Sequence, residues 1–307
     1  MSTEREPYVF LRGRMIPASE AHIAFYDAAV VLGATITDMA RTIGHVPFRL
    51  DDHVARFFRS CKYARIQPPV SEAELEARAR ELVAHNRELI GSEEDLSIVM
   101  FISPGEIAVY AGASELDRPM EPTLCVHTFS LPFQKWAAFF TEGAHVVTPW
   151  QRHVPPQCVD PKIKYRSRLH WWLADQETRL VDSQAVTLLL DLDGNVAECT
   201  GANFMIVRDG TLVCPSPRNI LRGISMVTAI ELCGELGIPV EERDFQVYDV
   251  VQADEAMLAS TPYCLAPVTK VNDHTISNGT SGPIFHRLLT AWSEKVGKDL
   301  LAQVKGR

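Results

Sequence analysis

Three features in residues 164–225 carry groups that can bind and react with a small molecule. Lys164 supplies an amine, Glu198 supplies a carboxylate among small residues, and Gly223-Ile224-Ser225 opens an apolar helix that we expect to run to about Leu236. The free N–H groups and the positive dipole end of a helix suit an anion, whereas a carboxylate suits a cation. The sequence therefore predicts a site for a ligand that is cationic at one end and anionic at the other.

A predicted β-meander positions the carboxylate. The apolar runs Val186–Leu190, 204–207 and 212–213 are expected to be strands. Asp193-Gly194 and Asp209-Gly210 separate these runs. Asp-Gly pairs favour type I′ hairpin turns, which need a positive φ at both central residues. Glu198 lies between the two turns and is thus expected on the meander.

The composition excludes several classes of function. Of 307 residues, 46% are apolar and 22% are charged, which allows a large core in two domains or in one α/β unit. A net charge of −9, without Lys/Arg runs, argues against binding to nucleic acid or to a membrane surface. The seven cysteines form no C-x-x-C pair, no metal-ligand spacing occurs, and the N-terminus lacks an apolar leader. We therefore expect a cytoplasmic protein with reduced thiols and no metal.

The order of the predicted elements divides the chain into a smaller α+β domain at 1–128, a linker at 129–137 and a larger domain at 138–307. The smaller domain is expected to begin with a hairpin at 8–16, a helix then a strand at 27–41, a turn at Gly44-His45 and a helix capped by Asp51 or Asp52. A capped helix at 71–90 and strands at 96–102, Ala108–Ala111 and 124–129 are expected to follow. The larger domain is expected to contain a strand at 144–148, a polar loop at 152–161, a partly helical segment at 163–180, the meander, a strand at 255–259 and a terminal helix at 284–296.

The motifs in this larger domain resemble a known family. Lys164 begins a K-x-x-S-R pattern, which is followed by D-x-D-G-N-V-x-E-C-T-G-A-N-F around Glu198 and then by L-x-G-I-S from Leu221. This series resembles the fold type IV pyridoxal phosphate enzymes, which include branched-chain aminotransferases, D-amino-acid aminotransferases, (R)-selective amine transaminases and aminodeoxychorismate lyases. The resemblance implies a two-domain fold with a smaller α+β domain and a larger barrel-like β-meander domain with helices. It also implies a homodimer, or a multiple of one, that binds pyridoxal 5′-phosphate.

The resemblance assigns the covalent chemistry to Lys164, which would form a Schiff base with the cofactor aldehyde and later move the α-proton of the substrate. Glu198 would pair with the pyridine nitrogen and keep it cationic, so that the ring accepts electrons. Leu221 would pack against the ring face. Taken alone, Glu198 could equally be a surface strand residue and Leu221 an ordinary core residue.

The resemblance also implies which residues bind the cofactor phosphate. They are Gly223, Ile224 and Ser225 at the helix start, Ser260 and Thr261 in S-T-P, and Arg56 in H-x-x-R. His53 and Arg56 lie three residues apart and so share one helix face. Alone, Arg56 would be an ordinary solvated charge, and its place in the joint pattern reverses that interpretation.

The chain departs from the family pattern on the substrate side. Arg222 stands where the family has a proline, and Leu169 stands where many branched-chain enzymes have a tyrosine. Thr37 and Asp38 stand where the family often has an aromatic residue and then Glu. Candidates for substrate recognition are Thr37 and three arginines: Arg41, Arg118 and Arg152. The loop at 103–118 lacks the Arg/His pattern of the D-specific enzymes, which disfavours that specificity.

These patterns predict an aminotransferase that works in ping-pong fashion on an L-branched-chain or other hydrophobic amino acid and a 2-oxo acid. The alternatives on the same fold are an aminodeoxychorismate lyase, a D-amino-acid aminotransferase and an (R)-amine transaminase. A further alternative is a binding protein that kept the fold and lost activity. Lys164, Glu198 and Arg56 together argue against that alternative, because a non-catalytic protein has no need for the lysine.

Overall fold

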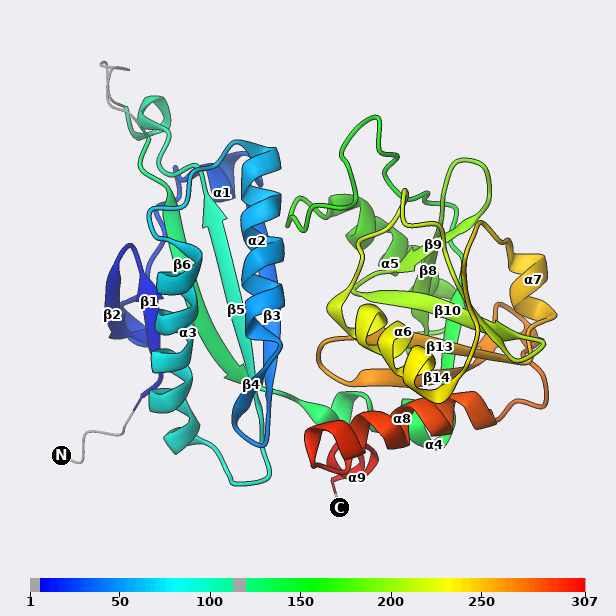
Figure 1. The fold of residues 1–307 in the computed structure, drawn as a ribbon. Coiled ribbons are helices and arrows are strands. Elements are labelled where there is room, and N and C mark those ends of the chain that lie inside the picture. Colours follow the sequence, from blue (N-terminus) through cyan, green and yellow to red (C-terminus); the bar gives the residue numbers. More distant parts are fainter. Residues whose placement is uncertain (1–5, 113–119, 307) are drawn as a thin grey trace. The chain divides into compact units, whose positions relative to one another are not determined.

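The computed structural model describes residues 6–112 and 120–306 and divides into two compact units (Figure 1). The N-terminal unit contains the described residues up to Leu131 together with Ile163–Ser167. The barrel unit contains Pro132–Lys162 and the described residues from Arg168 onward.

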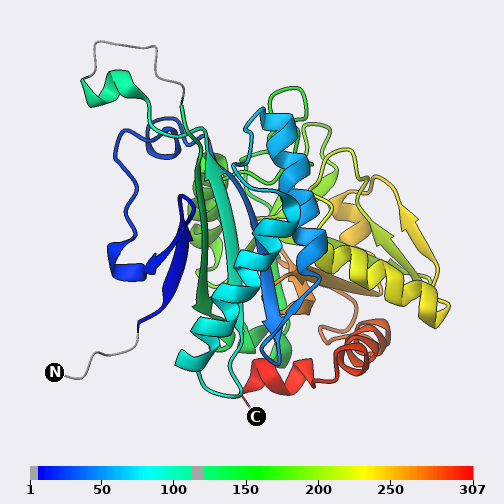
Figure 2. The ribbon, with the colours of Figure 1, turned by 60° about the vertical axis from the view of Figure 1, so that its left-hand side comes forward.

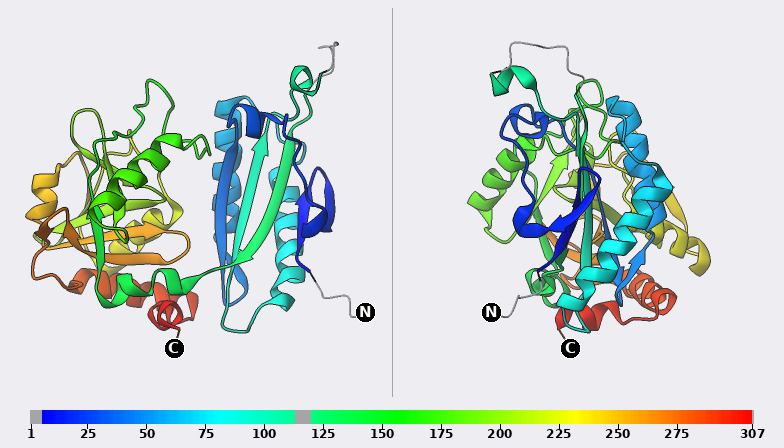
Figure 3. Two further views of the ribbon diagram at one scale, coloured as in Figure 1. Left: turned by 180° about the vertical axis from the view of Figure 1, so that it is seen from behind. Right: turned by 90° about the vertical axis from the view of Figure 1, so that its left-hand side faces the viewer.

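The N-terminal unit is an antiparallel sheet with two helices on one face (Figures 1 and 2). Within the described residues, the sheet has six strands in the order β2-β1-β6-β5-β3-β4. The strands are β1 (Tyr8–Leu11), β2 (Arg14–Pro17), β3 (Ile36–Ile43), β4 (Val46–Phe48), β5 (Leu96–Ser103) and β6 (Thr123–Ser130). Helices α2 (Leu50–Ala64) and α3 (Glu72–Asn86) pack against each other and against the sheet. Seen from behind, β5 and β6 lie in front of these helices (Figure 3). Short helices η1 (Ala18–Glu20), α1 (Ala28–Val31), η2 (Arg87–Leu89) and η3 (Ala108–Ala111) complete the unit.

The start of α3 is the one predicted from its capping box. The Ser71 hydroxyl accepts from the Glu74 N–H, and the Glu74 carboxylate accepts from the Ser71 N–H. Leu75, Ala79 and Leu82 recur at helical spacing and are buried against the sheet. The capping box and the helical spacing of the apolar residues indicate the same helix, and the structure confirms it.

Two other local predictions for this unit are wrong. Helix α2 has Arg49 in a left-handed conformation at its N-cap, and Asp51 and Asp52 lie in the first turn, where carboxylates stabilise the helix dipole without capping it. The predicted strand Ala108–Ala111 is the 3₁₀ helix η3, which ends at Gly112 with a φ of 78°. Apolar runs of this length do not distinguish strand from helix.

The barrel unit is built on a closed ring of strands. Its strands are β7 (Ala144–Val147), β8 (Val186–Leu190), β9 (Val196–Cys199), β10 (Ala202–Arg208), β11 (Thr211–Cys214), β12 (Val240–Glu242), β13 (Glu255–Ser260), β14 (Cys264–Val271) and β15 (His274–Thr275). Within the described part of the unit, β10-β13-β14-β7-β8-β9 follow one another, and a β9–β10 pairing closes this run into a six-stranded barrel. The helices are η4 (Phe133–Lys135), α4 (Ala137–Thr141), α5 (Leu169–Val181), α6 (Ile224–Leu236), α7 (Val247–Val251), α8 (Pro283–Val296) and α9 (Leu300–Lys305).

The two Asp-Gly turns of the meander differ. Asp209 and Gly210 have φ values of 49° and 75°, as a type I′ turn requires. At the other turn only Gly194 has a positive φ, so the predicted type I′ geometry is wrong there. Asp191 holds that turn instead, because its carboxylate accepts from the N–H groups of Asp193 and Asn195 at 3.0 and 2.8 Å.

The segment Ile163–Ser167 packs with the N-terminal unit, whereas the predicted boundaries placed it in the larger domain. The edge of β3 explains this difference. The Thr37 N–H donates to the Lys164 carbonyl at 2.9 Å, and the Arg166 N–H donates to the Thr35 carbonyl at 2.9 Å. Tyr165 thereby forms a bridge opposite Ile36, a pairing between distant parts of the chain that local sequence patterns do not reveal.

All seven cysteines lie in the described part of the chain and are free thiols. No helix within residues 6–112 and 120–306 is long and apolar enough to cross a membrane.

The β3–β4 turn yields a prediction about stability. Asp95 is fully buried and accepts from the Thr42 hydroxyl at 2.6 Å and from Arg41 Nη2 at 3.3 Å. We expect Asp95→Ala to lower the free energy of unfolding by about 3–5 kcal/mol, because it takes the carboxylate away from a buried guanidinium. Urea unfolding followed by circular dichroism measures this loss. Glu81→Ala, which removes an exposed ion pair with Arg78, is the control. Equal losses in both variants would contradict the structural role of Asp95.

Candidate active site

The start of helix α6 is shaped around a glycine. Gly223 is the N-cap, and its N–H donates to Asn203 Oδ1 at 3.1 Å. Asn203 Nδ2 donates to the Leu221 carbonyl at 2.8 Å. One amide side chain therefore binds both Leu221 and Gly223, which lead into the helix. A Cβ on Gly223 would lie 2.1 Å from Asn203 Oδ1, which only glycine avoids. The first-turn N–H groups, including those of Ile224 and Ser225, have no intrahelical acceptor and are available to an anion.

Glu198 lies beside this helix start. It is on β9 directly opposite Asn203 on β10, and only 5% of its surface is exposed. Its Oε2 accepts from the Leu221 N–H at 3.3 Å, with Asn203 Nδ2 at 3.5 Å. The prediction that the meander positions Glu198 is thus confirmed by the strand pairing, and the alternative of a surface strand residue is wrong.

The other oxygen of Glu198 contacts a residue that the sequence patterns did not single out. Oε1 lies 3.1 Å from His153 Nε2, and His153 Nδ1 lies 3.0 Å from the Val154 carbonyl. The His153 N–H donates to the Leu190 carbonyl at the end of β8, which ties this loop to the barrel. Burial alone would lower the pKa of His153, but the hydrogen bond and charge of Glu198 outweigh burial and raise the pKa above 6.5.

Ser260 is the last residue of strand β13 of the same barrel, and Thr261 follows it. Both are half-buried, and the Ser260 hydroxyl donates to the Gly201 carbonyl at 2.7 Å. Ser260 therefore ties the β13 end to the β9–β10 turn. The barrel unit thus brings the predicted Glu198 of β9 and the predicted residues of the α6 start together, with Ser260 linked to them through Gly201.

In the N-terminal unit, Lys164 is held by its backbone from two sides. Its N–H donates to the Ser60 hydroxyl on α2 at 3.2 Å, and its carbonyl accepts from Thr37 on β3. Ser60 in turn donates to the Arg56 carbonyl one helical turn earlier, at 3.0 Å. Burial lowers the pKa of His53; the hydrogen bond and charge of Asp38 oppose this effect, and the charges of Arg56 and Lys164 add to it.

Asp38 organises that face. Arg56 donates from Nε and Nη2 to the two Asp38 oxygens, each at 2.8 Å, and His53 Nδ1 is 2.8 Å from Asp38 Oδ1. Burial would raise the pKa of Asp38, but Arg56 and His53 outweigh burial and hold the pKa far below its usual range. The H-x-x-R pair therefore shares one face as predicted, and its arginine is fixed by a carboxylate.

The candidates for substrate recognition have varied surroundings. The Thr37 hydroxyl is buried and donates to the Met100 carbonyl at 2.9 Å. Arg41 is 2% exposed and bound to Asp95, so it supports the β3–β4 turn and does not face an open surface. Arg152 donates to the Pro149 carbonyl at 3.0 Å. Arg118 lies outside the described residues.

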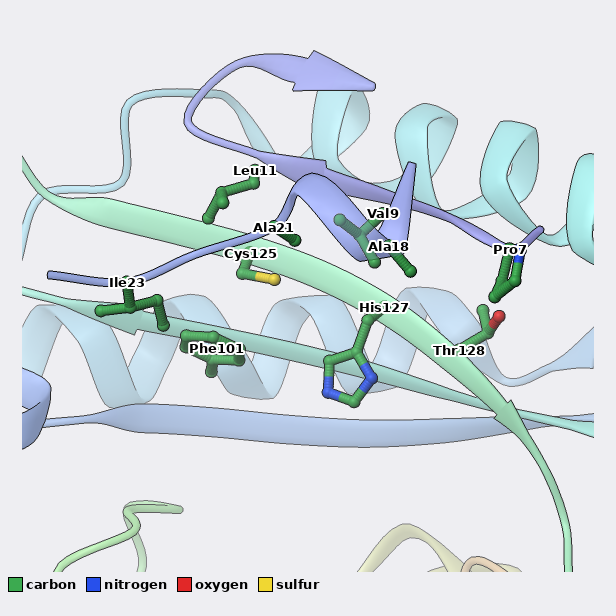
Figure 4. A pocket seen from close by; sticks show the side chains of 10 residues that line it. All are labelled: Pro7, Val9, Leu11, Ala18, Ala21, Ile23, Phe101, Cys125, His127 and Thr128. Atoms are coloured by element: carbon green, nitrogen blue, oxygen red, sulfur yellow. The ribbon is translucent and has the colours of Figure 1, made fainter. Parts of the chain in front are cut away.

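A separate pocket of about 260 Å³ lies within the N-terminal unit (Figure 4). Phe101 of β5 and Cys125 and His127 of β6 line it, together with Ala18, Ala21 and Ile23. Burial lowers the pKa of His127, so the lining is uncharged near neutral pH. This pocket offers space for apolar groups but neither an amine nor a carboxylate, and it is not a candidate for the chemistry of Lys164.

Local patterns missed His153, Asn203 and the role of Asp38. His153 belongs to a Pro-containing polar loop without a motif. Asn203 stood inside the recognised string, but only the β9–β10 register places it opposite Glu198. Asp38 was noted only as a departure from the family, and no local pattern indicates that it binds Arg56 and His53.

Comparisons with known proteins agree with this geometry. The model of the family described as amino-transferase class IV matches residues 35–271. The D-alanine aminotransferase of Bacillus licheniformis is 27% identical over 293 residues, which cover 94% of this chain and 96% of that protein. A putative branched-chain-amino-acid aminotransferase of Methanocaldococcus jannaschii is 26% identical over 298 residues, which cover 94% and 98%.

Solved structures show the same fold. The T.th. branched-chain amino acid aminotransferase with pyridoxamine 5′-phosphate has a TM-score of 0.81 and 25% identity, covering 95% of this chain and 94% of that one. The Escherichia coli branched-chain amino acid aminotransferase has a TM-score of 0.86 and 23% identity, covering 94% of each chain. The expected fold class, a smaller α+β part and a larger barrel with helices, is thus confirmed.

The crowding at Gly223 yields a prediction with a control in the same helix. We expect Gly223→Ala to lower the free energy of unfolding by about 1–3 kcal/mol, because the new methyl group displaces the Asn203 amide from its hydrogen bonds. Gly234 lies inside α6 with open space around its Cα, so Gly234→Ala should raise stability by about 0.5–1 kcal/mol. Thermal and urea unfolding of both variants measure this. Stabilisation by Gly223→Ala would show that Asn203 does not fix the helix start.

Proposed function

Because the chain belongs to the class IV aminotransferases, and is therefore a transaminase that uses pyridoxal 5′-phosphate, we propose that it takes the amino group of an L-branched-chain or other hydrophobic amino acid and passes it to a 2-oxo acid. The observation that carries the cofactor site of this proposal is the buried Glu198 carboxylate beside the glycine-led start of α6. Membership in an enzyme family leaves the alternative of a non-catalytic binding protein without support.

The residues of the barrel unit fit this cofactor. The N–H groups of Ile224 and Ser225 and the positive end of α6 suit a phosphate dianion, and Gly223 leaves backbone accessible where a side chain would not fit. In our proposal Ser260 and Thr261 add hydroxyl donors to the phosphate. The buried Glu198 carboxylate is proposed to bind the protonated ring nitrogen, and Leu221 to contact the ring face.

The residues of the N-terminal unit supply the covalent attachment and a further phosphate donor. Lys164 is proposed to join the cofactor covalently, and Arg56 to donate to its phosphate. Two guanidinium N–H groups of Arg56 are engaged by Asp38, which restricts the rotamers of the arginine. When bound, the cofactor supplies an electron-accepting ring that stabilises negative charge at the substrate α-carbon.

Proton transfer is proposed to be the work of Lys164. Once the substrate amine has displaced it, its Nζ would accept the proton from the substrate α-carbon and donate it, in the same half-reaction, to the cofactor carbon to which the lysine had been joined; the second half-reaction would run these transfers in reverse. A neutral amine is needed for the first of these steps.

The donor class is supported by the branched-chain aminotransferases among the relatives and solved structures. The absence of an Arg/His pattern in the sequence at 103–118 also favours the L-specific alternative over the D-specific one. A D-amino acid donor is the second candidate, and the D-alanine aminotransferase relative is the observation that supports it. The (R)-amine transaminase is a further outcome that the same experiment distinguishes, and conversion by none of the donors is the outcome expected of the lyase.

Assembly as a homodimer and a cytoplasmic location stay predictions from the resemblance and the composition.

Mixing the holoenzyme with single amino donors tests the donor class. We expect L-leucine and L-valine to convert the visible absorption band of the lysine-bound cofactor into the band of the aminated cofactor, because the first half-reaction needs no acceptor. D-alanine, D-leucine and an (R)-amine should leave the spectrum unchanged. Conversion by the D-amino acids or the amine alone would replace the proposed donor and keep the transaminase assignment.

A pair of lysine variants tests the covalent role. We expect Lys164→Ala to lose the band of the lysine-bound cofactor and to slow turnover by about a thousandfold or more, because the covalent attachment and the proton carrier are both removed. Lys162 is exposed and pairs with Asp160 at 3.2 Å, so Lys162→Ala should behave as the unmodified protein. Unfolding midpoints of both variants check that the fold is kept. Turnover by Lys164→Ala at the normal rate would contradict the assignment.

A further inference from the structure

We propose that His153 is a positioning residue that shares the Glu198 carboxylate with the cofactor ring nitrogen: as an imidazolium, it fixes the carboxylate and offsets part of its negative charge, and so sets how strongly the ring nitrogen is protonated. This inference rests on the proposed role of Glu198. It adds that the carboxylate does not act on the ring nitrogen alone.

The hydrogen bonds of His153 require both ring nitrogens to donate. Nδ1 faces the Val154 carbonyl at 3.0 Å, and Nε2 faces Glu198 Oε1 at 3.1 Å. A carbonyl oxygen and a carboxylate oxygen both accept. Only 5% of the His153 surface is exposed, so water does not replace either partner. The arrangement therefore favours the doubly protonated, cationic ring.

The charged groups around His153 come from each element packed against it. Glu198 on β9 contacts it directly, and Asp191 at the β8–β9 turn adds a second negative charge that favours the cation. His170 on α5 lies with its ring centroid 6.3 Å away. Burial, with the charges of His153 and Arg168, lowers the pKa of His170 to about 4, so this neighbour is neutral near pH 7. The surroundings thus favour a single positive charge, on His153.

The two oxygens of Glu198 have different partners. Oε1 is bound by His153, whereas Oε2 receives the Leu221 N–H at 3.3 Å. A positive charge on one side of a carboxylate weakens its attraction for a second cation. The ring nitrogen consequently binds a carboxylate whose charge is already partly balanced. Removing the imidazolium charge should make the nitrogen hold its proton more strongly, and removing the hydrogen bond should release the carboxylate.

The pH dependence follows from the same geometry. Because the pKa of His153 in the folded protein is raised above 6.5, its stabilising contribution is fully present below pH 6.5 and is lost as the pH rises through the raised value. Once Nδ1 or Nε2 of His153 loses its proton, the Val154 carbonyl or the Glu198 carboxylate faces a lone pair. The charge offset therefore weakens as the solution becomes alkaline.

The test uses holoenzyme loaded with pyridoxal 5′-phosphate that carries ¹⁵N at the ring nitrogen, whose chemical shift reports protonation across about pH 5–10. His153→Gln keeps an N–H donor and removes the charge. We expect it to raise the protonation constant of the ring nitrogen at least about tenfold, which is one pKa unit. His153→Phe keeps an aromatic ring and removes charge and donor, so the dissociation constant for pyridoxal 5′-phosphate should increase roughly tenfold as well.

His145 provides a matched control in the same unit. Its Nδ1 lies 2.7 Å from Asp182 Oδ2 and its Nε2 lies 2.7 Å from the Asn272 carbonyl, which is the same pattern of two acceptors on a different carboxylate. His145→Gln should leave the ring nitrogen and the cofactor affinity unchanged. A role of His153 in folding alone would change the unfolding midpoint without moving the ring-nitrogen titration.

The outcomes separate this inference from the proposed function. If the cofactor ring nitrogen titrates in His153→Gln as it does in the unmodified protein, the inference is overturned. This holds even if His153→Phe fails to fold. Glu198→Gln, measured in parallel, should lower the protonation constant of the ring nitrogen. If Glu198→Gln leaves it unchanged, the proposed role of Glu198 is itself wrong. If only Glu198→Gln has an effect, that role stands and His153 has no part in it.

Discussion

The pairing of β9 with β10 closes the barrel, and the organisation of the barrel's candidate site depends on it. Closure leaves no free edge between these strands and fixes their register, which puts Glu198 opposite Asn203. Asn203 then uses its amide to bind the Leu221 carbonyl and the Gly223 N–H. A carboxylate and a helix start, which are far apart in sequence, are thereby set at a fixed spacing. A shift of the register by one residue would turn Glu198 to the other face of the sheet and would break this arrangement.

Both units bury a carboxylate against a cation, with different consequences. In the N-terminal unit, Asp38 engages two N–H groups of Arg56. Their charges balance, so the arginine acts there mainly as an oriented donor. In the barrel unit, Glu198 has His153, whose charge depends on pH, and the backbone N–H of Leu221. A buried charge that lost its partner would be strongly destabilising. This explains why each carboxylate has several donors.

The parts of the structure that follow from local signals were predictable from the sequence. Helix α3 begins at a capping box and α6 begins after Gly223, and in each case the residues of a single helical turn specify the start. Ala108–Ala111 was mistaken for a strand, since four apolar residues fit either state. The pairing of the Lys164 segment with β3 and the contact of His153 with Glu198 arise from long-range packing. Family resemblance named Lys164 and Glu198, but neither periodicity nor spacing could name the residues that hold them.

The assignment of Lys164 as the residue that joins the cofactor is the claim on which the proposed chemistry depends most. The direct measurement is to treat the holoenzyme with borohydride, which reduces the bond between cofactor and protein to a stable amine, and then to map the modified peptide by mass spectrometry. We expect one phosphopyridoxyl group on Lys164 and none on the neighbouring Lys162. A phosphopyridoxyl group on any other lysine, or a protein that binds the cofactor and carries no label after reduction, would contradict the central claim.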